Sequence, residues 1–220
     1  MTIRSFPSAV IALLFLAACA GNTQKKDDPK PDNKKKEEYP VAAPLATEAM
    51  AGQKVCVLPM TLVVSEDSIA DQEPFNNRAR MLAMTDSLIG LALESRAPSV
   101  EWVLPPQVRQ IAKRAPGVIT DPDRMGQSVL RNEHIQDVPD PLWSNIRALS
   151  SIAGGRDIFV PSMIEFFKMP NNEYRAELSL AVADSRTGHI PWRTVATGIG
   201  PSAERAITAA MNAVLVLSRE

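Results

Sequence analysis

The side chains that most often perform catalysis or hold metal ions are few in this chain, and they are scattered along it. The two histidines are His134, in a stretch interrupted by proline and glycine, and His189, just after a predicted hairpin turn. No H-E-x-x-H, C-x-x-C or G-x-S-x-G motif is present, so the sequence indicates no metal site, no cofactor and no serine nucleophile. Glu165, Glu173 and Glu177 could act as acid and base, but exposed carboxylates on neighbouring strands are usually solvated. We therefore expect a protein that is not an enzyme and has no small-molecule substrate.

One cysteine stands out by its position. Arg4 precedes an uninterrupted apolar run over residues 9–18, too short to span a bilayer, and the run ends in Leu16-Ala17-Ala18-Cys19. Small residues directly before a cysteine resemble the cleavage site of bacterial lipoprotein signal peptides. The resemblance implies a signal peptide at residues 1–18 and, after its removal, diacylglycerol on the Cys19 sulfur and an acyl chain on its amino group. The alternative is an ordinary secretory signal with an incidental cysteine.

Residues 19–52 have the composition of a disordered linker. Lysines and acidic residues are balanced, six of each, prolines recur, and large apolar residues are almost absent before Val41. Balanced charge predicts no strong attraction to a membrane surface, although contact of the lysines with anionic lipid or cell-wall polymer is an alternative. The 34 residues could reach about 110–120 Å when fully extended. Ala20 and Gly21 lack the aspartate associated with inner-membrane retention, so the lipoprotein resemblance implies the outer membrane, with the following domain in the periplasm.

Residues 53–220 have the composition of one globular domain, long enough to bury a core. Its 17 Lys and Arg residues against 19 Asp and Glu residues indicate neither nucleic acid nor an acidic substrate as a partner. Because Cys19 is assigned to lipid, Cys56 has no partner for an intramolecular disulfide. In the apolar run Val55-Cys56-Val57-Leu58 a cysteine is usually a small buried side chain; the alternative is a reactive or intermolecular thiol.

The apolar periodicity of the domain predicts an α+β fold, with a single mixed sheet and helices packed on it. The last three strands are expected to form an antiparallel meander, which a C-terminal helix follows. The stretches 61–77 and 116–141 are expected to be loop and irregular structure. Helices are predicted at 78–96, from 105, at 142–153 and from 201, and strands at 54–60, 100–104, 157–167, 174–184 and 190–199.

Four short segments resemble a known group of periplasmic domains. The group includes the curli-secretion channel lipoprotein, the outer-membrane lipoprotein activators of bifunctional penicillin-binding proteins, and the amino-terminal domain of the Tol system's propeller protein. The resemblance covers Lys54–Leu217 and implies the same α/β fold and an envelope protein as partner, with a penicillin-binding protein as one candidate. The segments are Val55-Cys56-Val57-Leu58-Pro59-Met60, Asp157-Ile158-Phe159-Val160-Pro161-Ser162, Leu180-Ala181-Val182-Ala183-Asp184-Ser185-Arg186-Thr187-Gly188 and Trp192-Arg193.

Trp192 and Arg193 are the candidate interface residues, because tryptophan and arginine are favoured anchors of protein interfaces. Strand alternation places them on opposite faces, so at most one is exposed, and core packing is the alternative for Trp192. We expect a membrane-tethered adaptor or regulator of a periplasmic envelope machine, with cell-wall synthesis as one candidate. The alternative is an oligomeric subunit of an outer-membrane secretion channel, which would need hairpins of about 9–11 alternating residues per strand.

Overall fold

The computed structural model describes Tyr39 and residues 41–215. Cys19, the signal peptide at 1–18 and most of the segment assigned to the linker lie outside these residues and stay predictions. No helix in the described part of the chain is both long enough and apolar enough to cross a membrane.

The described residues form a single mixed sheet, as the sequence predicts, and it has six strands, one more than expected. The strand order is β3-β1-β4-β5-β6, and β2 also pairs with β4. β1 is parallel to β3 and β4, β2 is parallel to β4, and β4, β5 and β6 form the antiparallel meander. The strands are β1 (Lys54–Val57), β2 (Val63–Ser65), β3 (Glu101–Val103), β4 (Asp157–Lys168), β5 (Tyr174–Asp184) and β6 (Trp192–Gly200).

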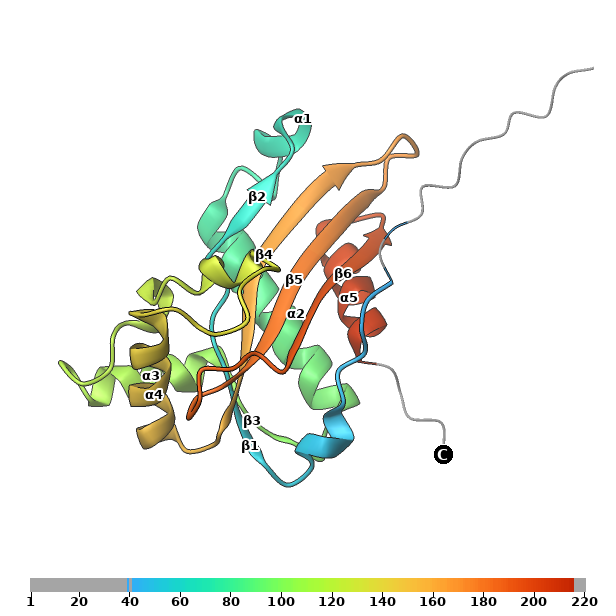
Figure 1. The fold of residues 1–220 in the computed structure, drawn as a ribbon. Helices are drawn as coiled ribbons and strands as arrows, with labels where there is room; N and C mark the ends of the chain where they lie inside the picture. Colours follow the sequence, from blue (N-terminus) through green and yellow to red (C-terminus); the bar gives the residue numbers. More distant parts are fainter. Residues whose placement is uncertain (1–38, 40, 216–220) are drawn as a thin grey trace, which may run out of the picture. The chain divides into compact units, whose positions relative to one another are not determined.

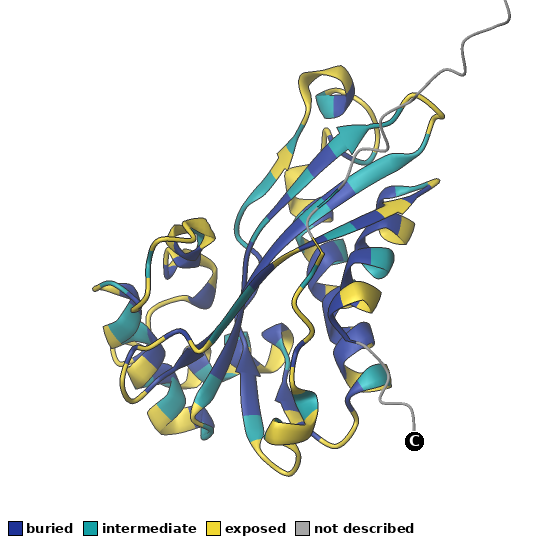
Figure 2. Cartoon of the chain, turned by 45° about the vertical axis from the view of Figure 1, so that its right-hand side comes forward, coloured by how far each residue is buried: buried dark blue, intermediate teal, exposed yellow. Residues whose placement is uncertain are grey.

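Helices cover the two faces of the sheet unequally (Figure 1). α2 and α5 enclose the larger apolar core along one face, whereas α3 and α4 enclose a second core over the part of the sheet that contains β1 and the start of β4. Figure 2 shows this burial along the strands, with exposed residues at the loops and hairpin tips. The helices are α1 (Asp67–Ala70), α2 (Arg78–Arg96), α3 (Pro105–Arg114), α4 (Leu142–Ala153) and α5 (Ala203–Val214), with 3₁₀ turns η1 (Thr47–Met50), η2 (Pro122–Arg124) and η3 (Gln127–Arg131).

The sequence predicted only loop for the stretch 61–77, and this is wrong, because the stretch contains β2 and α1. β2 has three residues and α1 has four. Elements this short carry no measurable periodicity, and β2 exists because the edge of β4 offers it a backbone partner: Val63 is paired with Ile164.

The described part of the segment assigned to the linker lies against the sheet and α5. Leu45 is only 6% exposed, and its N–H donates to the carbonyl of Val214 at 3.0 Å. The indole N–H of Trp192 donates to the carbonyl of Pro44 at 3.1 Å. Residues 41–52 therefore do not contribute freely to the reach of a tether.

α5 packs directly on the backbone of β6. A Cβ atom on Gly198 would lie 2.1 Å from the carbonyl oxygen of Ala206, and one on Gly200 would lie 2.7 Å from the Cβ of Arg205. Only glycine at these positions lets the helix approach so closely. Gly198 and Gly200 are thus explained by helix packing.

A buried carboxylate joins α2 to three other elements. Asp86 accepts hydrogen bonds from the Met60 N–H and from the guanidinium of Arg109, both at 2.7 Å. The same guanidinium donates to both carboxylate oxygens of Asp123. Burial raises the pKa of Asp86, and the bonds from Met60 and Arg109 oppose that rise. The charge of Arg109 therefore stabilises an otherwise costly buried group.

We expect Met211→Ala to lower the free energy of unfolding by about 2–5 kcal/mol, because it removes a fully buried side chain between α5 and the sheet. Chemical denaturation monitored by circular dichroism measures this change. The neighbouring exposed residue gives a matched control, since Asn212→Ala should leave stability nearly unchanged. Equal stability of the two variants would mean that α5 does not close the core.

Candidate functional site

Trp192 and Arg193 lie on opposite faces of β6, as alternation predicts, and both make internal contacts. The ring of Trp192 stacks on Phe159 with centroids 6.3 Å apart. The guanidinium of Arg193 donates to the carbonyls of Asn132 and Ile135, at 2.6 and 2.9 Å, and burial lowers its pKa. Each residue thus has a structural role, and their part in an interface stays a prediction.

His189 and Cys56, also singled out from the sequence, lie in different surroundings. His189 Nδ1 lies 3.4 Å from a carboxylate oxygen of Asp137, on the surface. Cys56 is buried, with Sγ 3.5 Å from the carbonyl of Gly154, and burial raises its pKa to about 11. This supports the small buried side chain over the reactive thiol. Within Tyr39 and residues 41–215, no group of three His, Cys, Asp or Glu side chains could hold a metal ion.

The candidate functional site is a part of the sheet that α3 and α4 leave uncovered. Alternation turns every second residue of β4, β5 and β6 away from α2 and α5, and the strand register aligns these residues in three rows across the sheet. We call this surface the three-row face. Its rows are Met163, Ser179 and Val195; Glu165, Glu177 and Thr197; and Phe167, Arg175 and Ile199.

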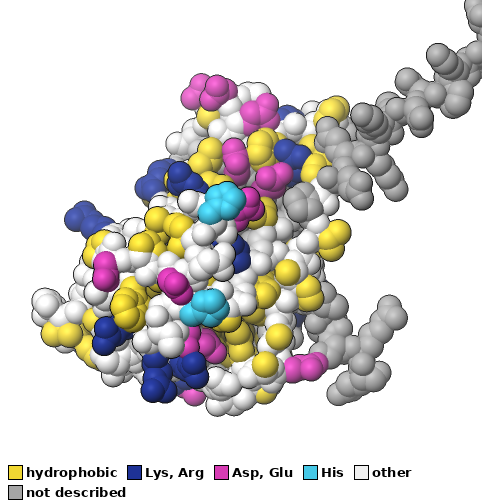
Figure 3. Space-filling model, viewed as in Figure 1, with side chains coloured by type: hydrophobic (Ala, Val, Ile, Leu, Met, Phe, Trp, Pro, Cys, Tyr) yellow, Lys and Arg dark blue, Asp and Glu magenta, His cyan; other side chains and the backbone are white. Residues whose placement is uncertain are grey.

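The outer rows of the three-row face are mainly apolar. Val195 and Ile199 are each 38% exposed although they are β-branched aliphatic residues. Over the ends of β4, β5 and β6, hydrophobic, acidic and basic side chains gather on the same surface (Figure 3). A hollow of about 330 Å³ borders the first row, between Val195 and Leu130 of η3. Exposed apolar side chains bordered by charged ones make this surface a candidate protein interface.

The middle row places two carboxylates directly opposite each other. Glu165 on β4 pairs in register with Glu177 on β5, and like charges in this position destabilise a sheet. Arg175 compensates Glu177, with Nε 3.5 Å from its carboxylate oxygen. In the part of the chain that the structure describes, Glu165 has no cationic partner, and the neighbouring Thr197 hydroxyl is buried without a hydrogen-bond partner.

Arg175 also attaches the start of the described chain to the three-row face. Its guanidinium lies between two aromatic rings, 4.2 Å from the centroid of Phe167 and 4.8 Å from that of Tyr39. Such stacking is favourable for arginine. The chain that leads from the predicted anchor therefore joins the domain at the margin of this surface.

The three-row face is suited to receive a basic side chain between apolar ones. A lysine or arginine of a partner would neutralise Glu165, which Arg175 leaves uncompensated, and apolar neighbours would cover Val195 and Ile199. The sequence identified the two glutamates as candidates for acid–base chemistry or as solvated groups. Their pairing could not be known from it, since it depends on the register of β4 and β5.

Glu165→Gln should raise the free energy of unfolding by about 0.2–1 kcal/mol, because it removes the repulsion between opposed carboxylates. Denaturation at neutral pH and low salt measures the gain, and high salt should reduce it. Glu173→Gln is the control: its carboxylate accepts a hydrogen bond from Asn171 in the β4–β5 turn, so no gain is expected. Destabilisation by Glu165→Gln would mean that the carboxylate serves the fold.

No protein-family model and no curated protein matches this chain. Among solved structures it is similar to the LpoB C-terminal domain from Salmonella enterica, with 13% identity, 70% of this chain and 85% of that chain covered, and a TM-score of 0.38. It is similar to the PelC dodecamer from Paraburkholderia phytofirmans, with 12% identity, coverage of 80% and 95%, and a TM-score of 0.37. It is also similar to lipoprotein GNA1162 from Neisseria meningitidis, with 17% identity, coverage of 68% and 82%, and a TM-score of 0.34.

Proposed function

We propose that this chain is a non-enzymatic lipoprotein of the outer membrane that acts as a tethered adaptor or regulator of a periplasmic envelope machine. Its partner is a protein that presents a basic side chain between apolar ones to the three-row face, and a cell-wall synthase of the penicillin-binding class is the first candidate. The observation that supports this most is the middle row, where Glu165 and Glu177 oppose each other beside an unpartnered hydroxyl. Arg175 compensates Glu177 but not Glu165, and the uncompensated carboxylate is accounted for when a basic side chain of a partner neutralises it.

The packing of residues 41–52 shortens the reach expected for the tether. Nineteen residues lie between Cys19 and Tyr39, where the chain stacks on Arg175. Fully extended, they reach about 65–70 Å, and a flexible coil of that length averages about 25 Å. The domain can therefore act at a moderate distance from its anchor, with the three-row face near the point of attachment.

Tether length should control activity, and tether sequence should not. Deleting residues 22–38 should abolish complementation of a deletion strain, because a linker that cannot span the gap removes the effective concentration of the domain at its partner. A Gly/Ser segment of equal length should restore activity. Both changes stop before Tyr39, so the contact with Arg175 is kept. Growth in the presence of a β-lactam is the readout.

Protein level and membrane fraction are checked for every variant. Cys19→Ser, which should take up no palmitate label, shows the result of losing the anchor alone. Full activity of the shortened chain would contradict a reaching adaptor and favour a channel subunit held at the membrane. Palmitate label on Cys19→Ser would contradict the lipid anchor.

Reversing the charge of the middle row should abolish activity without unfolding the domain. The double variant Glu165→Lys with Glu177→Lys replaces an acidic pair by a basic one, which repels the proposed basic side chain of the partner. Glu94→Lys, an exposed position on α2, is the matched control and should complement fully. Equal complementation by the double variant and the control, at equal protein levels, would show that the partner does not use the three-row face.

A further inference from the structure

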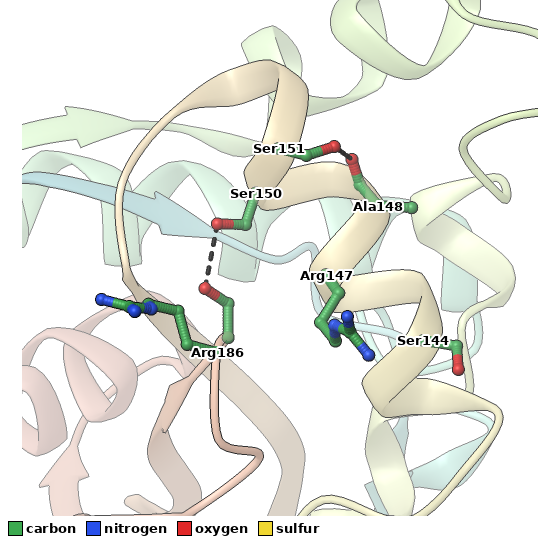
Figure 4. A pocket seen from close by; sticks show the side chains of 7 residues that line it. Ser144, Arg147, Ala148, Ser150, Ser151 and Arg186 are labelled. Carbon is green, nitrogen blue, oxygen red and sulfur yellow. Dashed lines mark hydrogen bonds between the residues drawn. The ribbon is translucent and has the colours of Figure 1, made fainter.

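A second surface, at the other end of β5, has the properties of a ligand site. A hollow of about 640 Å³ lies between α4 and the turn that joins β5 to β6. Arg147 stands on α4 and Arg186 on the turn, on either side of Ser150 (Figure 4). The volume falls in the range of roughly 300–1,000 Å³ that is common for small-molecule sites. We call this feature the arginine hollow.

The α4 wall of the arginine hollow follows from helical spacing. Ser144, Arg147, Ala148 and Ser151 recur at the i, i+3, i+4 and i+7 positions, which form one stripe along a helix. The opposite face of α4 carries Ile146 and Leu149, both fully buried in the second core. Burial of that face fixes the direction in which the stripe points.

The turn wall is held in place by two contacts. The indole N–H of Trp143 donates to the carbonyl of Ser185 at 3.2 Å, which ties the turn to α4. Asp184 accepts a hydrogen bond from the backbone N–H of Arg186 at 2.8 Å and another from the guanidinium of Arg156. The bond from Arg156 lowers the pKa of Asp184 to about 2. The walls of the arginine hollow are therefore positioned before any ligand arrives.

Two positive charges in the arginine hollow lack a counterion. Arg156 is neutralised by Asp184, but neither Arg147 nor Arg186 forms an ion pair among the described residues. The guanidinium of Arg147 lies 5.0 Å from the ring centroid of Trp143, which leaves its N–H donors available. The hollow therefore favours an anionic group, which a guanidinium binds through two parallel hydrogen bonds.

The serine pair in the arginine hollow offers acceptors only. The Ser150 hydroxyl donates to the carbonyl of Gly155, so its single proton is used. In the hydrogen bond between the hydroxyls of Ser150 and Ser185, at 2.9 Å, Ser185 must then be the donor. Neither hydroxyl has a proton left for a ligand. Because Ser185 is only 3% exposed, the Ser150 oxygen is the acceptor of this pair that a ligand can reach.

The other two serines of the hollow also donate their hydroxyl protons to acceptors within the protein. Ser144 donates its hydroxyl proton to the carboxylate of Asp140 at 2.7 Å, and Ser151 donates to the carbonyl of Ala148 at 2.8 Å. A simple anion could accept hydrogen bonds from the two arginines, but it has no N–H or O–H group to donate to the serine oxygens. A complementary ligand carries an anionic group together with hydroxyl or amide donors.

We propose that the arginine hollow binds an acidic saccharide, whose carboxylate or phosphate pairs with Arg147 and Arg186 and whose hydroxyl or amide groups donate to the serine oxygens. This site is separate from the three-row face and does not depend on the function proposed for it. It adds a glycan contact to a domain that also carries a protein-binding surface.

Calorimetric titration of the whole chain, purified in detergent, tests this proposal with a matched pair of sugars. N-acetylmuramic acid should bind at least about tenfold more tightly than N-acetylglucosamine, which lacks the carboxylate, and added salt should weaken the binding. N-acetylglucosamine 6-phosphate, measured in parallel, decides whether carboxylate or phosphate is the preferred anion. Arg147→Gln and Arg186→Gln should each weaken the tighter sugar by about tenfold or more.

Arg124→Gln is the matched control, since Arg124 is an exposed arginine on η2 outside the hollow, and it should bind as the unaltered chain does. Equal binding of the neutral and acidic sugars, or unchanged binding in both hollow variants, would overturn the proposal. Acetate or inorganic phosphate binding as tightly as the acidic sugars would show a simple anion site and would overturn the saccharide assignment. Absence of binding by both acidic sugars would also overturn it.

Discussion

The strand β4 is longer than the helix that covers one side of it, and the candidate interface follows from this mismatch. Both elements have 12 residues, but the rise per residue makes β4 about 40 Å long and α4 about 18 Å. On the other face α2, with 19 residues, and α5 together cover the meander. The end of the sheet near the β4–β5 turn is therefore closed on one side only, and its side chains there alternate between fully buried and partly exposed.

The elements predicted most accurately from the sequence are those with strong local periodicity. The helices at 78–96 and 142–153 and the strand at 174–184 have the predicted bounds. β2 and α1 were missed because elements of three and four residues are too short to show a periodic pattern. β2 forms because it pairs with the edge of β4. The packing of 41–52 was missed for a related reason, since Leu45 is buried by a contact with Val214 far along the chain.

The residue types of the candidate site were visible in the sequence, but their juxtaposition was not. A register shift between Pro161 and Met163 sets which residue of β5 lies opposite Glu165, and a shift of one residue would turn the side chain to the other face. The close packing of α5 on Gly198 was not predicted from the sequence. A glycine at a core-facing position before an alanine-rich helix is a usable signal of close packing, since both partners must be small.

The two proposed surfaces lie at opposite ends of β5. Arg175 and Glu177 belong to the three-row face, and Asp184 fixes the turn of the arginine hollow, so roughly 30 Å of strand separates the ends. The surfaces also differ in charge, one acidic and one basic, so a single ligand would not satisfy both. Because Tyr39 joins the tether to the acidic end, the basic end is the part of the domain farthest along β5 from the point of attachment. The two proposed contacts, with a protein near the predicted tether and with a glycan at the far end, would therefore not compete for the same surface.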